Sequence, residues 1–285
     1  MADTRTAWFN GGFVPLAEVS LSPMDRGFLF ADGIYEVTAV LDGRLVDSAS
    51  HLARLERSAQ ALEIPLPLSI PQIEAVEREL IARNALDRGT VYIQLTRGAA
   101  ERDFLGEPET PTLLIFTQAD DMLANPAVET GVAVVTMPDI RWGRRDIKSV
   151  MLLAQVLAKR AARDAGAKEA WLVDEASFVT EGASSTALIV TADGTLVTRP
   201  NSATILPGCT RAAVLALAER DQVPLEERAF TVAEALAARE AMLTSASNFV
   251  IPIVRIDGQP VGDGTPGPIA RRLRALYLEM ARNSG

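Results

Sequence analysis

The beginning of the chain alternates short apolar runs with turn residues. The segment Trp8–Val14 has an Asn-Gly pair between apolar residues, which predicts a β-hairpin. Residues 34–41 and 44–47 flank an Asp-Gly pair and predict a second hairpin. Antiparallel sheet is therefore expected in this part of the chain.

Helical periodicity follows, and then further strands. Residues 49–62 and 71–84 carry apolar positions three or four apart, and Pro71 suits the first turn of the second helix. Strands are predicted at 90–96 and 112–118. Together these elements predict an α+β domain over residues 1–119.

A change of composition predicts the domain boundary. Residues 120–130 are acidic, contain Pro126 and lack clear periodicity, which is typical of an interdomain linker. A second domain is expected over residues 131–285, where strands and helices are mixed. Its helices are predicted near 149–165, 210–221, 231–239 and 267–282, and its strands near 131–136, 170–174, 186–191 and 196–198.

Composition narrows the classes of function. The chain has 37 acidic and 28 basic residues, a net charge of -9 and no Lys/Arg block, which argues against a nucleic-acid or anionic-membrane partner. One cysteine, Cys209, excludes an internal disulfide, and one histidine, His51, leaves no Cys/His cluster for zinc. Without an apolar signal-peptide core or a run long enough to span a bilayer, a cytoplasmic location is expected.

Lysine is rare in this chain, and one lysine has a distinctive position. The 28 basic residues include three lysines, and Lys148 lies just before the helix predicted near 149–165. A cation at a helix start is disfavoured by the macrodipole, which lowers an amine pKa, and a neutral amine can form a Schiff base. Lys148 is therefore a candidate for amine chemistry. The alternative is a solvated surface charge, as expected for Lys159 and Lys168.

Several segments could bind an anion. His51 and Arg54 are three apart on a predicted helix and share a face, although a solvated helix face is the alternative. The run Leu206–Arg211 has a Pro-Gly turn followed by a predicted helix N-terminus, which attracts phosphate, although Thr210 could be a plain N-cap. The run 244–248 offers small and hydroxyl side chains after an apolar strand.

One carboxylate suits a pyridine ring. Glu181 is followed by a glycine that leaves room for a flat ring and then by Ser184 and Ser185, which can donate hydrogen bonds. A glutamate beside a pyridine nitrogen favours the protonated ring, which then accepts electron density. The alternative is an exposed glutamate in a turn.

In this order, the segments resemble the fold type IV family of pyridoxal-phosphate enzymes, and most closely its D-amino-acid (D-alanine) aminotransferases. The resemblance spans nearly the whole chain and implies an α/β protein with an α+β N-terminal domain and a mixed α/β, barrel-like C-terminal domain. The blocks that carry it are Asp25–Glu36, His51–Leu55, Tyr92–Gly98, Asp139–Trp142 with Asp146–Ser149, Thr180–Ser185 and Leu206–Arg211.

The resemblance implies a pyridoxal 5'-phosphate cofactor and roles for the candidate residues. Lys148 would form the Schiff base, Arg54 would hold the phosphate and Glu181 would face the pyridine nitrogen. Further cofactor contacts are implied at Leu206, Cys209, Thr210, Ser245 and Ala246, with backbone groups of the last four donating to the phosphate.

The substrate-binding residues show one departure from the family. The resemblance implies that Tyr35 and Arg102 bind the substrate carboxylate, and Phe104 stands where the D-amino-acid aminotransferases have histidine. Losing a neutral hydrogen bond weakens binding by about 0.5 to 1.5 kcal/mol, whereas Arg102 keeps a charge-assisted contact. The resemblance also implies a homodimer in which Arg102 reaches the neighbouring subunit.

The expected reaction is transamination of D-amino acids with a 2-oxoacid such as 2-oxoglutarate, by a ping-pong route through a pyridoxamine form. L-Branched-chain aminotransferases and 4-amino-4-deoxychorismate lyases share the resemblance and stay open as alternatives. A hydrolase using His51 with Ser48 or Ser50 lacks the Gly-x-Ser-x-Gly elbow, and a dehydrogenase lacks Gly-x-Gly-x-x-Gly. A non-catalytic binding protein is a further alternative.

Overall fold

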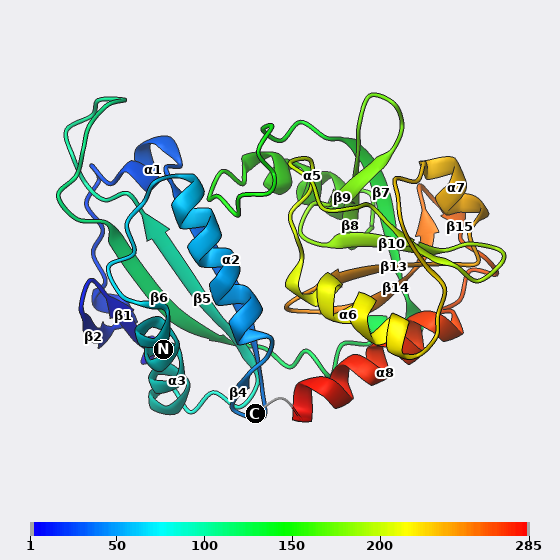
Figure 1. The fold of residues 1–285 in the computed structure, drawn as a ribbon, viewed down its shortest axis with the longest axis horizontal. Coiled ribbons are helices and arrows are strands. Elements are labelled where there is room, and N and C mark those ends of the chain that lie inside the picture. Colours follow the sequence, from blue (N-terminus) through cyan, green and yellow to red (C-terminus); the bar gives the residue numbers. More distant parts are fainter. Residues whose placement is uncertain (1–2, 284–285) are drawn as a thin grey trace. The chain divides into compact units, whose positions relative to one another are not determined.

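The computed structural model describes residues 3–283, which form two compact units (Figure 1). Within the described residues, the first unit runs to Met122 and also contains Ile147–Met151 and residues 281–283; the second contains Leu123–Asp146 and Leu152–Met280. The division after Met122 falls within the linker predicted for residues 120–130, where the short helix α4 (Ala127–Thr130) lies. The predicted outer domain limits, residues 1 and 285, lie outside the described residues.

Within the described residues, the first unit is built on a six-stranded antiparallel sheet in the order β2-β1-β6-β5-β3-β4. Helices α2 and α3 pack against this sheet through buried residues such as Leu52, Leu55, Ile73 and Leu80. The strands are β1 (Thr6–Phe9), β2 (Gly12–Pro15), β3 (Gly33–Leu41), β4 (Arg44–Leu45), β5 (Gly89–Thr96) and β6 (Thr112–Ala119). The helices are a 3-10 turn (Leu16–Glu18), α1 (Arg26–Phe30), α2 (Ser48–Ala61) and α3 (Ile70–Arg83).

Local sequence accounts for the first hairpin. Asn10 and Gly11 connect β1 and β2 with φ values of 44° and 101°. A two-residue hairpin turn of this kind needs positive φ at both central residues, which asparagine and glycine tolerate. The hairpin predicted from the Asn-Gly pair is confirmed.

The second unit holds a nine-stranded mixed sheet, within the described residues, in the order β12-β11-β10-β13-β14-β7-β8-β9, with β15 on β14. Strands β14, β7 and β8 run parallel, and β9 also contacts β10, so the sheet curls back on itself. Its strands are β7 (Val132–Pro138), β8 (Glu169–Val173), β9 (Val179–Gly182), β10 (Thr186–Val190), β11 (Leu196–Thr198), β12 (Leu225–Glu227), β13 (Glu240–Ser245), β14 (Phe249–Ile256) and β15 (Gln259–Pro260). The remaining helices are α5 (Leu153–Asp164), α6 (Cys209–Arg220), α7 (Val232–Ala237) and α8 (Pro268–Asn283).

The helix start predicted near residue 149 is wrong. Helix α5 begins at Leu153, because backbone groups of the preceding residues form hydrogen bonds with β3 instead of bonds of the helical pattern. The N–H of Tyr35 donates to the carbonyl of Lys148 at 3.0 Å, and the N–H of Val150 donates to the carbonyl of Gly33 at 3.0 Å. Lys148 therefore lies before helix α5 and outside it, and the helix dipole does not act on this lysine, since that effect is confined to the first turn.

No helix in the described part of the chain is long and apolar enough to cross a membrane.

Candidate active site

Lys148 lies against an aromatic ring in the first unit. Its Nζ is 4.3 Å from the centroid of the Tyr35 ring, and its backbone N–H donates to Ser58 Oγ on α2 at 3.4 Å. The backbone N–H of Tyr35 also donates to the carbonyl of Lys148, so the lysine backbone is fixed through both its N–H and its carbonyl. An aromatic face attracts a cationic amine. The half-buried amine is thus held by β3 and α2 in a defined place.

The other two lysines differ from Lys148. Lys159 was expected to be a solvated surface charge. Its side chain is 39% exposed, but its Nζ also lies 3.3 Å from Oε1 of the buried Glu169 and donates to the carbonyl of Lys168 at 3.0 Å. Lys168 is exposed, as expected. Neither has an aromatic ring beneath its amine among the contacts of the described residues.

His51 and Arg54 share a face of α2, as predicted, but the alternative of a solvated face is wrong. Both side chains are buried and both bind Glu36 of β3. Arg54 Nε and Nη2 donate to the two Glu36 oxygens at 2.7 and 2.8 Å, and His51 Nδ1 lies 2.9 Å from Glu36 Oε2. The two-point contact fixes the plane of the guanidinium. The sequence did not identify Glu36, because nothing in its own strand shows that it faces α2.

The electrostatics of this cluster favour the ionised carboxylate. Burial on its own would raise the pKa of Glu36, but the charge and hydrogen bonds of Arg54, together with His51, lower that pKa to about 2. Its ordinary value is 4.5, so the carboxylate stabilises the fold fully above pH 4.5, and this stabilisation is lost as pH falls through the folded-state value.

We expect the substitution Glu36→Gln to lower the free energy of unfolding at pH 7 by roughly 3 to 5 kcal/mol, because it removes one charge of a buried ion pair with Arg54. Urea unfolding at several pH values measures this, and the difference from the wild type should narrow as pH falls from 4.5 towards 2. The control is Glu74→Gln, which breaks an exposed pair with Arg78 and should cost less than about 1 kcal/mol. Equal effects of the two changes would contradict the prediction.

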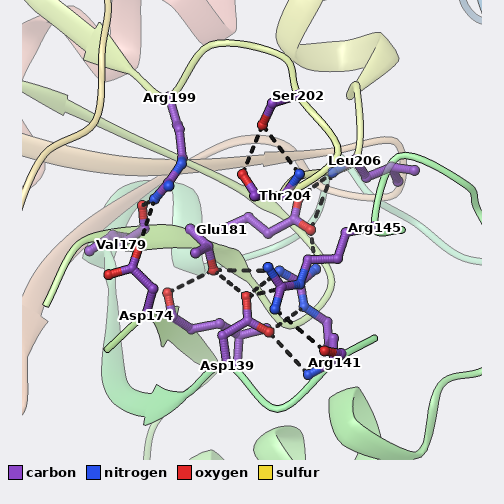
Figure 2. Close-up of polar contacts among 12 residues, drawn as sticks. Asp139, Arg141, Arg145, Asp174, Val179, Glu181, Arg199, Ser202, Thr204 and Leu206 are labelled. Carbon is purple, nitrogen blue, oxygen red and sulfur yellow. Dashed lines mark hydrogen bonds and ion pairs between the residues drawn. The ribbon is translucent and has the colours of Figure 1, made fainter. Parts of the chain in front are cut away.

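Glu181 is the centre of a buried polar cluster in the second unit (Figure 2). It lies in β9, so the alternative of an exposed glutamate in a turn is wrong. Arg141 Nη1 donates to Glu181 Oε1, and the backbone N–H of Leu206 donates to Glu181 Oε2 at 3.1 Å. The same guanidinium donates to both oxygens of Asp139, at 2.9 and 2.7 Å. Leu206, a predicted cofactor contact, therefore also anchors the carboxylate of Glu181 through its backbone.

Burial controls the pKa of the two carboxylates differently. For Glu181 burial is the largest influence and raises the pKa, although Arg141 and the Leu206 N–H counteract it. For Asp139 burial also raises the pKa, but hydrogen bonds and charge from Arg141 outweigh it and lower the pKa below its ordinary value. Of the two carboxylates, Glu181 is the one whose affinity for a proton is increased.

The start of α6 supplies donors for an anion. Its N-cap is Gly208, so the alternative of Thr210 as a plain N-cap is wrong. Backbone N–H groups in the first helical turn, including those of Cys209 and Thr210, have no partner within the helix. The buried hydroxyls of Thr210 and Thr244 have no hydrogen-bond partner among the described residues. A Cβ on Gly208 would lie 2.9 Å from the hydroxyl of Thr186, so only glycine allows this close approach.

Unsatisfied buried hydroxyls beside a helix N-terminus fit a phosphate group. Thr244 pairs with Thr186 across β10 and β13, which places its hydroxyl in the region that Gly208 approaches. Ser245 and Ala246 follow directly at the end of β13, and the N–H of Asn248 donates to the carbonyl of Ser245 at 3.3 Å. The predicted donors at α6 and at the end of β13 thus belong to one region of the second unit.

The predicted substrate residues lie in two places in the first unit. Tyr35 is half-buried, and its ring stacks on Tyr92 with centroids 5.7 Å apart. Arg102 and Phe104 lie on an exposed loop and both contact Phe30, with the Arg102 Cζ at 5.6 Å and the Phe104 ring at 5.3 Å from its centroid. Sequence reasoning missed Phe30, because the loop and α1 are distant along the chain.

Comparisons with known proteins identify the family. A profile described as amino-transferase class IV matches residues 33–256. A D-alanine aminotransferase of Staphylococcus aureus (strain COL) is 40% identical over 269 residues, 94% of each chain, and one of Staphylococcus epidermidis (strain ATCC 12228 / FDA PCI 1200) gives the same figures. A solved branched-chain amino acid aminotransferase from T.th., with pyridoxamine 5'-phosphate, matches with a TM-score of 0.91 and 25% identity over 99% of this chain and 95% of that one.

The chain therefore belongs to the class IV aminotransferases. These are pyridoxal-phosphate-dependent enzymes, and the predicted fold type IV architecture, enzyme class and cofactor are confirmed. The structure fits this cofactor: it has a buried carboxylate of raised pKa for a ring nitrogen, and unsatisfied hydroxyls at a helix N-terminus for a phosphate.

Proposed function

We propose that this enzyme transfers the amino group of D-amino acids to a 2-oxoacid acceptor such as 2-oxoglutarate, in two half-reactions linked by the pyridoxamine form of the cofactor. The observation that carries the proposal is the 40% identity to D-alanine aminotransferases over 94% of both chains. The solved branched-chain enzyme shares the fold at 25% identity. L-Branched-chain transamination and aminodeoxychorismate cleavage are accordingly secondary alternatives.

Pyridoxal phosphate supplies the carbon that accepts the amino group and a ring that accepts electron density. We assign Lys148 the covalent attachment and the movement of the substrate Cα proton by its Nζ. Glu181 binds the ring nitrogen and keeps it protonated, which is supported by its burial and raised pKa. The same amine would therefore hold the cofactor and carry the substrate proton.

We assign both charged and neutral hydrogen-bond donors to the cofactor phosphate. Arg54 supplies a guanidinium whose plane is fixed by Glu36. The backbone groups of the predicted set, with the unsatisfied hydroxyls of Thr210 and Thr244, supply neutral donors. Leu206 is assigned to the ring because its N–H binds Glu181. The backbone donors assigned to the phosphate are Cys209, Thr210, Ser245 and Ala246. In this proposal Glu181 of the second unit binds the ring nitrogen.

We assign the substrate carboxylate to Tyr35 and Arg102, and we propose a homodimer in which Arg102 serves the neighbouring subunit. The support is an exposed apolar group on the first unit: Phe28 and Phe104 are each 77% exposed and Leu105 is 86% exposed. Phe104 and Leu105 are neighbours in the chain, and exposed apolar side chains of this kind are typical of protein interfaces. A cytoplasmic location agrees with a single, buried cysteine.

The loop that carries Arg102 and Phe104 offers a test of how the substrate carboxylate is recognised. We expect Phe104→His to restore a donor and lower the KM for D-amino acids by about 2- to 12-fold, with kcat little changed. Steady-state kinetics with D-alanine measure this. The control is Leu105→His, which adds the same side chain at the next, exposed position. An unchanged KM for Phe104→His, or an equal decrease for the control, would contradict the assignment.

One experiment tests the proposed function directly. The purified enzyme is mixed separately with D-alanine, D-glutamate, L-leucine and aminodeoxychorismate, and conversion of the aldehyde form of the cofactor to its amine form is followed by absorbance. We expect D-substrates to convert the cofactor rapidly and the other two to leave it unchanged. Conversion by L-leucine alone, or pyruvate release from aminodeoxychorismate, would replace the proposal with the corresponding alternative.

A further inference from the structure

Arg141 is the charged partner of Glu181, and it also has a second carboxylate partner, Asp139. Its guanidinium binds Asp139 on one side and Glu181 on the other, as Figure 2 shows. The side chain of Arg141 is 6% exposed, that of Asp139 1% and that of Glu181 6%. Two carboxylates thus share one arginine at a site with little exposure to solvent, where ionic contacts are screened less than at the surface.

The arginine is itself fixed to the strand framework. Asp139 follows β7, and its N–H donates to the carbonyl of Val173 in β8 at 2.9 Å. The hydroxyl of Thr180 lies 2.6 Å from Asp139 Oδ2, and Arg141 Nη2 lies 3.4 Å from the same hydroxyl. Arg141 is therefore held at both carboxylate contacts by residues whose positions β7, β8 and β9 determine.

This arrangement leaves Glu181 with one oxygen less engaged than the other. Among the described residues, Oε1 receives Arg141 and a longer contact of 3.4 Å from the N–H of Leu206, whereas Oε2 receives only that N–H, at 3.1 Å. A carboxylate oxygen has two lone-pair directions, so Oε2 can accept a further donor such as a protonated pyridine nitrogen. The contact of Arg141 at Oε1 decides which oxygen is presented.

We propose that Arg141 is the positioning residue for Glu181: it orients the carboxylate and sets its affinity for a proton, while Asp139 holds Arg141 in place and offsets its charge. The inference rests on the proposed role of Glu181 towards the ring nitrogen. Without Asp139, the full charge of Arg141 would lower the pKa of Glu181 and make its carboxylate a weak hydrogen-bond acceptor. Without Arg141, the pKa of Glu181 would rise and its side chain would lose its orientation.

Geometry explains why the residue is arginine. Its planar guanidinium donates in two directions at once, to Asp139 through Nε and Nη2 and to Glu181 through Nη1. A lysine ammonium at this position is a point charge that cannot reproduce the planar two-sided contact. Arg141→Lys is therefore expected to keep part of the electrostatic effect and to lose orientation.

The experiment measures the titration of Glu181 by ¹³C NMR of the full chain labelled at glutamate carboxyl groups, with Glu181→Gln identifying the signal. We expect Arg141→Gln to raise the pKa of Glu181 by about 1 to 3 units, because an opposite charge is removed. Asp139→Asn should shift the pKa in the opposite direction, because it removes a like charge and leaves the arginine. If Arg141→Gln fails to fold, the shift of the Glu181 pKa in Asp139→Asn still tests the inference.

Arg145 provides the matched control. Its Nε lies 3.4 Å from Asp139 Oδ2, and none of its contacts among the described residues is to Glu181. Arg145→Gln removes the same charge from the same cluster and should shift the Glu181 titration much less than Arg141→Gln does. Equal shifts would show a general field effect and would overturn the positioning role.

A second readout uses the holoenzyme with ¹⁵N-labelled pyridoxal phosphate. We expect Arg141→Gln to move the ring-nitrogen resonance and lower kcat about 10- to 100-fold with a smaller change in KM, since misplacing a catalytic group has that effect. Arg141→Lys should recover part of both. An unmoved Glu181 titration in folded Arg141→Gln overturns the inference, whereas an unmoved ring signal in Glu181→Gln overturns the proposed role of Glu181 itself.

Discussion

Replacing Lys148 with alanine is expected to abolish transamination, leaving less than about 1% of the wild-type rate. The same amine is assigned both the covalent link to the cofactor and the transfer of the Cα proton, and each function contributes orders of magnitude to the rate. The structure holds this amine over the Tyr35 ring, with β3 and α2 fixing the backbone around it. Steady-state kinetics and mass spectrometry of the borohydride-reduced protein measure the two functions separately.

Lys168 is the control, because it is exposed and no aromatic ring contacts it among the described residues. Lys168→Ala should keep wild-type activity and the reduced adduct. In the wild type the adduct should map to the peptide that contains Lys148. Appreciable turnover by Lys148→Ala, or an adduct on Lys159 or Lys168, would disprove the assignment and with it the proposed mechanism.

The substitution Glu181→Gln is expected to slow removal of the Cα proton by about 100-fold or more, while cofactor affinity changes far less. Glutamine keeps the size of the side chain and can still accept from the N–H of Leu206, but it cannot keep a pyridine nitrogen protonated. The phosphate contacts assigned elsewhere are unaffected. Stopped-flow single-turnover kinetics measure the chemical step, and cofactor fluorescence measures retention.

The control for this change is Glu175→Gln, in an exposed turn before β9. It should leave both measurements at wild-type values. Single-turnover rates unchanged by Glu181→Gln would remove the electron-accepting role from this residue. A large loss of cofactor with an unchanged chemical step would instead make Glu181 a binding residue only.

Local sequence was sufficient for most elements. The Asn-Gly hairpin, the α2 and α3 periodicities and the strands β3, β5 and β6 depend on neighbours in the chain, and the structure confirms them. The six resemblance blocks likewise predicted the family, because each is a short continuous segment of distinctive residues.

Tertiary contacts decided where the helix after Lys148 begins. The residues just before α5 were predicted to be helical, but their backbone pairs with Gly33 and Tyr35 of β3, which lie far earlier in the chain. No local pattern shows that such a partner exists. The contact also determines the setting of Lys148, because it places the amine on the Tyr35 ring.

The sequence by itself determined the family, the order of the elements and the candidate lysine, arginine and glutamate. Only the tertiary structure showed that Glu36 orients Arg54 and that Arg141 links Asp139 to Glu181. The physical reason is that a charge state depends on burial and on partners that other elements bring within a few ångströms. Residue type and spacing specify neither.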